Sequence, residues 1–224
     1  MPRFSEADHA LVTEAVARAE RSSDGEIVTI VAPRSDAYHD VGLHYAILAT
    51  LLVPTIGAVL PQAWIDWVLG LVFGWNAGLS FRLGMLSLVV AMAIVFLIVR
   101  FALAWMPLRM ALTPASTKTR RVRRRAVELF RAGTERRTRG RTGILLYLSL
   151  LEHRAEIVAD EAIHGKVAPE LWGEAMAELI DAVRAGRPSD GMAAAVERIG
   201  AVLAEHFPRS ATDTNELPDR LIEL

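Results

Sequence analysis

Residues 83–106 read LGMLSLVVAMAIVFLIVRFALAWM, and residues 42–60 read GLHYAILATLLVPTIGAVL. The only charge in the longer run is Arg100, close to its end, where a long side chain can reach the lipid headgroups. A helix of about 20 residues crosses a hydrocarbon core of roughly 30 Å, and bilayer helices tolerate residues such as Pro54 and Gly57. Neither run has the polar face of a helix in a soluble core. The two runs therefore predict two membrane-spanning helices.

The connection between these runs, residues 61–82, reads PQAWIDWVLGLVFGWNAGLSFR. Its apolar content leaves a third span open. Three tryptophans together with Asp66 and Asn76 favour instead a helix that lies in the membrane interface, where tryptophan is enriched. We therefore expect two spans with an interfacial, tryptophan-rich connection.

Charge is distributed very unevenly along the chain. Residues 107–142 hold 12 of the 25 Lys and Arg residues but only two acidic residues, whereas the connection holds only Arg82. The positive-inside rule places the basic side in the cytoplasm. The chain begins with a charged, amphipathic segment that lacks the apolar core of a signal peptide. We expect a multi-pass protein of a bacterial inner (cytoplasmic) membrane, with both termini cytoplasmic.

The remaining segments alternate between helix and strand patterns. Residues 26–32, EIVTIVA, form a short β-branched run that predicts a buried strand, and residues 142–151 and 155–159 predict a β-hairpin around a polar turn at residues 152–154. Apolar residues at helical spacing predict helices over the following ranges: 5–21, 117–138, 169–185 and about 190–206.

A single apolar strand is not stable alone, and the natural partner of residues 26–32 is the distant hairpin at 142–159. The apolar runs then interrupt one α/β domain, and strands on both sides of them must meet on one side of the membrane, which requires an even number of crossings. The chain is predicted to divide into a first part of the domain (1–41), a transmembrane hairpin (42–106), a basic juxtamembrane helix (107–141), the rest of the domain (142–207) and a tail (208–224).

At these residues the chain resembles the TPM domain family. The resemblance rests on GEIVTIVA at 25–32, on RTGILLYLSLLEHRAEIVAD at 141–160 and on NELPDRLIEL at 215–224. It implies an α/β fold with a central sheet flanked by helices. Some family members are described as phosphatase-like or as binding divalent cations, and others as accessory proteins of membrane complexes.

Asp160, Glu161 and His164 form the strongest local cluster of possible metal ligands, and Glu26 at a strand start could lie nearby. Oxygen and imidazole groups of this kind can hold a weakly bound Ca²⁺ or Mg²⁺ ion. The resemblance assigns Asp160 to an acidic position of the family after the last hairpin strand. The alternative is that the cluster is a solvated loop in which Asp160 caps the following helix.

The basic segment predicts contact with anionic lipid headgroups, because it follows directly on a span. The residues expected to make this contact are Lys118, Arg120, Arg121, Arg123, Arg124 and Arg125. A protein partner and nucleic acid are the alternatives, and nucleic acid is not expected.

No cysteine is present, which excludes thiol chemistry, and phosphate-loop, HExxH, nucleophile-elbow and dinucleotide motifs are absent from the sequence. We therefore expect an accessory or scaffold protein that presents a cytosolic TPM-like domain to an unidentified membrane protein. The alternative is a metal-dependent, phosphatase-like hydrolase, so the sequence leaves enzymatic activity open.

Overall fold

The computed structural model describes residues 4–74, 80–133, 142–167, 170–210 and 217–224. The chain divides into two compact units: an α/β unit of residues 1–36 and 114–224, and a helical unit of residues 37–113. One excursion of the chain thus separates two parts of the α/β unit. The helical unit contains the predicted insertion of residues 42–106 and extends beyond it at both ends.

A four-stranded sheet with the order β3-β2-β1-β4 forms the centre of the α/β unit. Strands β1 (Glu26–Ala32) and β2 (Gly143–Ser149) are parallel, in a register that places Ile30 beside Tyr147, and β3 (Arg154–Ala159) is antiparallel to β2. Every residue of β1 and β2 is buried, as expected for central strands covered on both faces. The predicted pairing of β1 with the distant hairpin is confirmed.

The C-terminal segment also joins this sheet. Its last strand, β4 (Ile222–Glu223), runs parallel to β1 and pairs at Ile30 and Val31. Leu217, at the start of the described tail, is buried. The end of the chain is therefore docked along β1.

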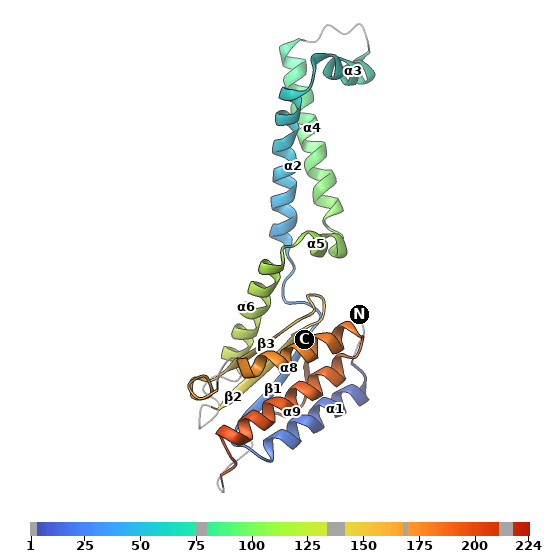
Figure 1. The fold of residues 1–224 in the computed structure, drawn as a ribbon. Coiled ribbons are helices and arrows are strands. Elements are labelled where there is room, and N and C mark those ends of the chain that lie inside the picture. Colours follow the sequence, from blue (N-terminus) through green and yellow to red (C-terminus); the bar gives the residue numbers. More distant parts are fainter. Residues whose placement is uncertain (1–3, 75–79, 134–141, 168–169, 211–216) are drawn as a thin grey trace. The chain divides into compact units, whose positions relative to one another are not determined.

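Helices cover both faces of the sheet (Figure 1), which confirms the predicted α/β class. One core cluster lies between the sheet and α1, α8 and α9, and the second lies between the sheet and α6. The bounds of the helices of this unit are α1 (Glu6–Glu20), α6 (Ala115–Gly133), α7 (Glu161–His164), α8 (Glu170–Arg184) and α9 (Pro188–His206).

Helix α1 begins at a reciprocal capping box. The backbone N–H of Ser5 donates to Oδ2 of Asp8 at 2.8 Å, and the N–H of Asp8 donates to Oγ of Ser5 at 3.2 Å. The helix packs closely on α9, because a Cβ atom at Gly200 would lie 2.5 Å from the Cβ of Ala19. This contact holds the first segment of the chain against its last helix.

The helical unit consists of α2 (His39–Val59), α3 (Gln62–Phe73), α4 (Phe81–Ala102) and α5 (Met106–Leu112), and α2 packs along α4. Helices α2 and α4 are long and apolar enough to cross a membrane. Helix α3 has only 12 residues, about 18 Å of rise, which is too short to span. Trp75 and Asn76 lie outside the described residues.

Arg109 of α5 closes this unit at one end. Its guanidinium donates to the carbonyl oxygens of Leu103 and Ala37, each at 2.7 Å, and to that of Ala104 at 3.3 Å. The side chain is buried, and its positive charge lies at the C-terminal end of α4, where helix carbonyl groups favour a cation. A single side chain therefore joins the segment before α2 to the segment after α4.

Candidate functional site

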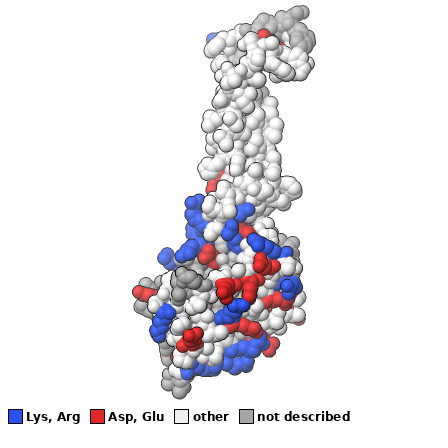
Figure 2. Space-filling view, viewed as in Figure 1, with Lys and Arg blue, Asp and Glu red and all other residues white. Residues whose placement is uncertain are grey.

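The basic helix α6 is sharply divided into two faces. Val122, Ala126 and Phe130 are buried against the sheet, where Tyr147 belongs to the same cluster. The remaining surface carries seven cationic side chains and a single acidic one, Glu128, and Lys and Arg gather over this helix in the space-filling view (Figure 2). Its cationic residues are Lys118, Arg120, Arg121, Arg123, Arg124, Arg125 and Arg131. Packing thus keeps the cations of α6 off the helix face that is buried against the sheet, and Arg123 lies beside the outer strand β3.

Only part of this charge is neutralised within the α/β unit. The carboxylate of Asp36 lies 3.0 Å from Arg121 and 3.1 Å from Arg124. Glu128 lies 3.8 Å from Arg124 and 3.6 Å from Arg125. Among the described residues, the other cations of α6 form no ion pair. The helix therefore keeps a net positive surface.

A groove of about 460 Å³ runs along the outer side of β3. Helix α6 contributes Arg123 and Val127 to one wall, and α8 contributes Trp172 and Met176 to the other. His164 lies at the groove as well, and residues 155–159 of β3 form its floor. All six residues of β3 are only half-buried, in contrast to the fully buried β2.

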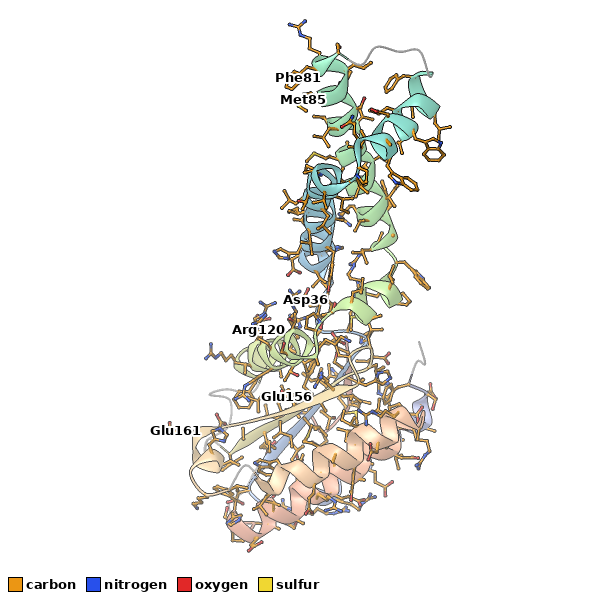
Figure 3. The ribbon with its side chains drawn as sticks, turned by 45° about the horizontal axis from the view of Figure 1, so that its top comes forward. Asp36, Phe81, Met85, Arg120, Glu156 and Glu161 are labelled. Carbon is orange, nitrogen blue, oxygen red and sulfur yellow. The ribbon has the colours of Figure 1, made fainter. Side chains whose placement is uncertain are left out.

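Glu156 lies on β3 beneath α6 (Figure 3). Burial raises the pKa of this carboxyl, and the cations of Arg123 and Arg154 oppose the rise. The buried Nε of Arg154 has no hydrogen-bond partner among the described residues. This side of the groove therefore combines the cation of Arg123 with a carboxyl group whose pKa is raised, and Arg154 lies on the same strand.

The four predicted metal ligands are placed in different surroundings. Asp160 is buried and its Oδ2 accepts the backbone N–H of Gly143 at 3.1 Å, so it does not cap the next helix through its side chain. Glu161 and His164 are exposed on the short helix α7. Oε2 of Glu26 accepts the N–H of Leu217 at 3.0 Å. Within the described ranges, no three His, Asp or Glu residues group as a metal site, and cation binding stays a prediction.

The turn predicted at residues 152–154 contains a buried acid. Glu152 accepts the backbone N–H of Ser35 at 2.9 Å through Oε1, and Oγ of Ser149 donates to its Oε2 at 2.5 Å. Oγ of Ser35 also lies 3.0 Å from the hydroxyl of Tyr147. This polar cluster fixes the segment that follows β1, directly before Asp36.

Glu20 was not singled out by the sequence. It ends α1, and its Oε1 accepts the backbone N–H of Ile27 at 2.9 Å. Burial raises the pKa of Glu20 from 4.5 to about 8, and the nearby carboxylates of Asp219 and Glu26 add to the rise. Only the docking of the tail brings Asp219 to this position, so no local pattern could have indicated the shift.

Comparisons with known proteins agree with this fold. The model of the TPM domain matches residues 108–202, from α5 into α9. The structure is similar to the NMR structure of the BA42 protein from the psychrophilic bacteria Bizionia argentinensis sp. nov., with a TM-score of 0.56 and 14% sequence identity. That alignment covers 100% of this chain and 97% of the other. No curated protein matches the sequence.

Proposed function

Because the model of the TPM domain matches residues 108–202 and two long apolar helices interrupt the α/β unit, we propose that this chain is an accessory protein of a bacterial inner membrane. In this proposal α2 and α4 cross the bilayer as a hairpin. The α/β unit lies in the cytoplasm, where it presents a binding surface to a membrane protein partner. Helix α6 contacts anionic lipid headgroups.

The exposure of the apolar helices supports membrane insertion. Helices α2 and α4 have 21 and 22 residues, about 32 and 33 Å of rise, which matches a hydrocarbon core. None of the spanning window of α4 is buried, although the core helix of a soluble protein is mostly buried. Hydroxyl groups within the helices donate to carbonyls one turn back, as Thr50 does to Ala46 at 2.8 Å. An exposed apolar surface of this size is typical of a site that contacts a membrane.

The shared sheet supports an even number of crossings. Strands β1 and β2 lie on either side of the helical unit in sequence and pair over seven residues. Two crossings return the chain to the side that it left, whereas three would separate the two strands. The cationic residues follow α4 rather than the α3 connection, which supports a cytoplasmic α/β unit by the positive-inside rule.

The charge of α6 supports a role at the lipid surface. Only residues 103–114 separate it from α4 in the sequence, which makes it a juxtamembrane segment in this proposal. Each cation near an anionic bilayer contributes up to about 1 kcal/mol of attraction.

A metal-dependent hydrolase needs acidic side chains that converge around an ion and a position for the attacking water. In the described parts of the chain, Asp160 and Glu26 both lie beside Gly143 at one end of the sheet, but their carboxylates accept backbone N–H groups, and no three His, Asp or Glu residues group as a metal site. The geometry therefore favours the accessory role over hydrolysis.

Extraction of membranes at alkaline pH tests the proposal. Cells that produce the full chain should retain it in the membrane pellet, because integral proteins resist this treatment. Val90 and Ile94 are exposed on α4, and a Val90→Asp/Ile94→Asp variant should be released, since central charges oppose insertion. The control Ser87→Ala should stay in the pellet. Release of the native chain would overturn membrane insertion.

A further inference from the structure

Strand β3 forms one edge of the sheet, and the two-residue strand β4 forms the other. The N–H of Asp160 donates to the carbonyl of Gly143 at 2.9 Å, which fixes the phase of the antiparallel ladder. The backbone N–H and C=O groups of every second residue before Asp160 then point toward β2. The N–H and C=O groups of the residues between them, Ala155, Ile157 and Ala159, point outward. No hydrogen bond joins these groups to another described residue.

The groove places chemically different walls on the two sides of this edge. Trp172 and Met176 of α8 provide a largely apolar wall, and Ile157 packs on the same side of the sheet. On the other side, Arg123 of α6 lies over Glu156, with Arg154 on the same face of β3. An added strand alternates its side chains between two faces. One face of such a strand would meet apolar residues, and the other would meet the cations of Arg123 and Arg154 together with the carboxyl group of Glu156.

We propose that β3 binds an extended segment of a partner protein as a fifth strand, with apolar side chains toward Trp172 and Met176 and an acidic side chain toward Arg123. This inference rests on the proposed scaffold role and names the chemistry of the partner. Backbone hydrogen bonds to Ala155, Ile157 and Ala159 supply affinity, and the two walls supply selectivity, as in other cases of strand addition.

The occupant is a peptide segment rather than a second copy of this chain. Side chains of α6 and α8 rise on both sides of β3, so two identical edges would bring identical walls into collision. Paired strands must approach to about 4.8 Å, and a bare extended segment can reach that distance between the walls. The net positive charge of α6 also opposes its own copy and attracts an acidic segment.

Fluorescence anisotropy on the full chain in detergent tests this proposal. The probe is a labelled ten-residue peptide in which valine alternates with threonine, with one central threonine replaced by aspartate. We expect saturable binding. Methylation of the backbone nitrogens that face β3 should weaken it at least tenfold, and so should Ala155→Pro, which removes one outward N–H. The methylated peptide needs no change to the protein, so its result does not depend on how a variant folds.

Charge is tested separately. Arg123→Glu should weaken binding of the aspartate peptide at least tenfold and strengthen binding of a peptide with lysine at that position. Arg131→Glu, an exposed change on the same helix outside the groove, should alter affinity less than twofold.

Three results would overturn the proposal: no binding of the probe, equal binding of the methylated peptide, or equal effects of Arg123→Glu and Arg131→Glu. A dimer in detergent that Ala155→Pro converts to a monomer would also overturn it, in favour of a second copy at β3. Because the assay uses detergent, it does not depend on membrane topology, and failure here is distinct from failure of the proposed membrane insertion.

Discussion

The carboxylate of Asp36 lies 3.0 Å from the guanidinium of Arg121 and joins two points that are far apart in sequence. Asp36 is the last residue of the α/β unit before the helical unit. Arg121 belongs to α6, the first helix after the chain re-enters the α/β unit. The pair is mostly shielded, with 22% and 13% of the two side chains exposed. The ion pair therefore holds the segment that ends the first part of the α/β unit against α6.

Asp36→Asn should destabilise the α/β unit by about 1–2 kcal/mol, between the values for exposed and buried ion pairs, because it leaves Arg121 without this carboxylate. Chemical denaturation in detergent, followed by circular dichroism, measures the change. Glu128→Gln is the matched control. Its contacts with Arg124 and Arg125 are longer and more exposed, so it should cost less than about 0.5 kcal/mol. Equal effects of the two changes would contradict the fastening role of Asp36.

Ile30→Asp tests the shared sheet. Ile30 is buried on β1 beside Tyr147 of β2, so an aspartate there would bury a charge without a partner, at a cost of several kcal/mol. Limited proteolysis should then cleave within residues 143–207, although the protein stays in the membrane. Leu11→Asp, at a more exposed position on α1, should leave these residues resistant. Unchanged resistance in Ile30→Asp would show that β1 does not complete this domain.

Glu20 predicts a dependence of stability on pH. Its pKa is about 8 in the folded protein and 4.5 as a model value, so between these values the folded state binds more protons than the unfolded state. The free energy of unfolding should therefore fall as pH rises from about 5 through 8, by up to about 1.4 kcal/mol per unit of pH.

Thermal unfolding of the native chain and of Glu20→Gln from pH 5 to 9 measures this effect. The amide can still accept the N–H of Ile27 but cannot ionise, so the variant should be the more stable protein at pH 9. Glu14→Gln, an exposed change on α1, should follow the native curve. Parallel curves for the native chain and Glu20→Gln would contradict the raised pKa.

Arg109→Lys should loosen one end of the helical unit. Lysine keeps the charge but lacks the planar fork with which Arg109 reaches Leu103, Ala37 and Ala104. At least one buried carbonyl would lose its donor, at about 1–3 kcal/mol. Amide hydrogen exchange in detergent should become faster at residues 103–109 but not in the middle of α4. Unchanged exchange at residues 103–109 would show that the contacts of Arg109 do not hold this end.

The sequence predicts the central strands because β1 and β2 are covered on both faces and therefore consist of continuous apolar runs. The apolar helices are equally clear, because their length and lack of a polar face admit few alternatives. Strand β4 has two residues and depends on β1 for its existence, so its pattern carried no signal that could distinguish docking from a free tail.

The candidate site is harder to predict, because it depends on the order of the strands in the sheet and not on the pattern of neighbouring residues in the sequence. That β3 is an outer strand follows from the pairing of β1 with β2, and the groove exists only because α6 and α8 flank that edge. Asp160 illustrates the same limit. Its position after a strand suggested a ligand or a cap, but the adjacent strand supplies a backbone N–H that its carboxylate accepts.

The placement of the α/β unit on one side of the membrane is tested most directly by labelling of single cysteines. The native chain has none, so Ser22→Cys, Asn76→Cys and Ser210→Cys each give one thiol. Ser22 and Ser210 are exposed in the α/β unit, and Asn76 lies in the connection between α3 and α4. An impermeant thiol reagent on intact cells should label only Asn76→Cys, and all three after permeabilisation. Labelling of Ser22→Cys or Ser210→Cys in intact cells would contradict a cytoplasmic α/β unit held by a two-span hairpin.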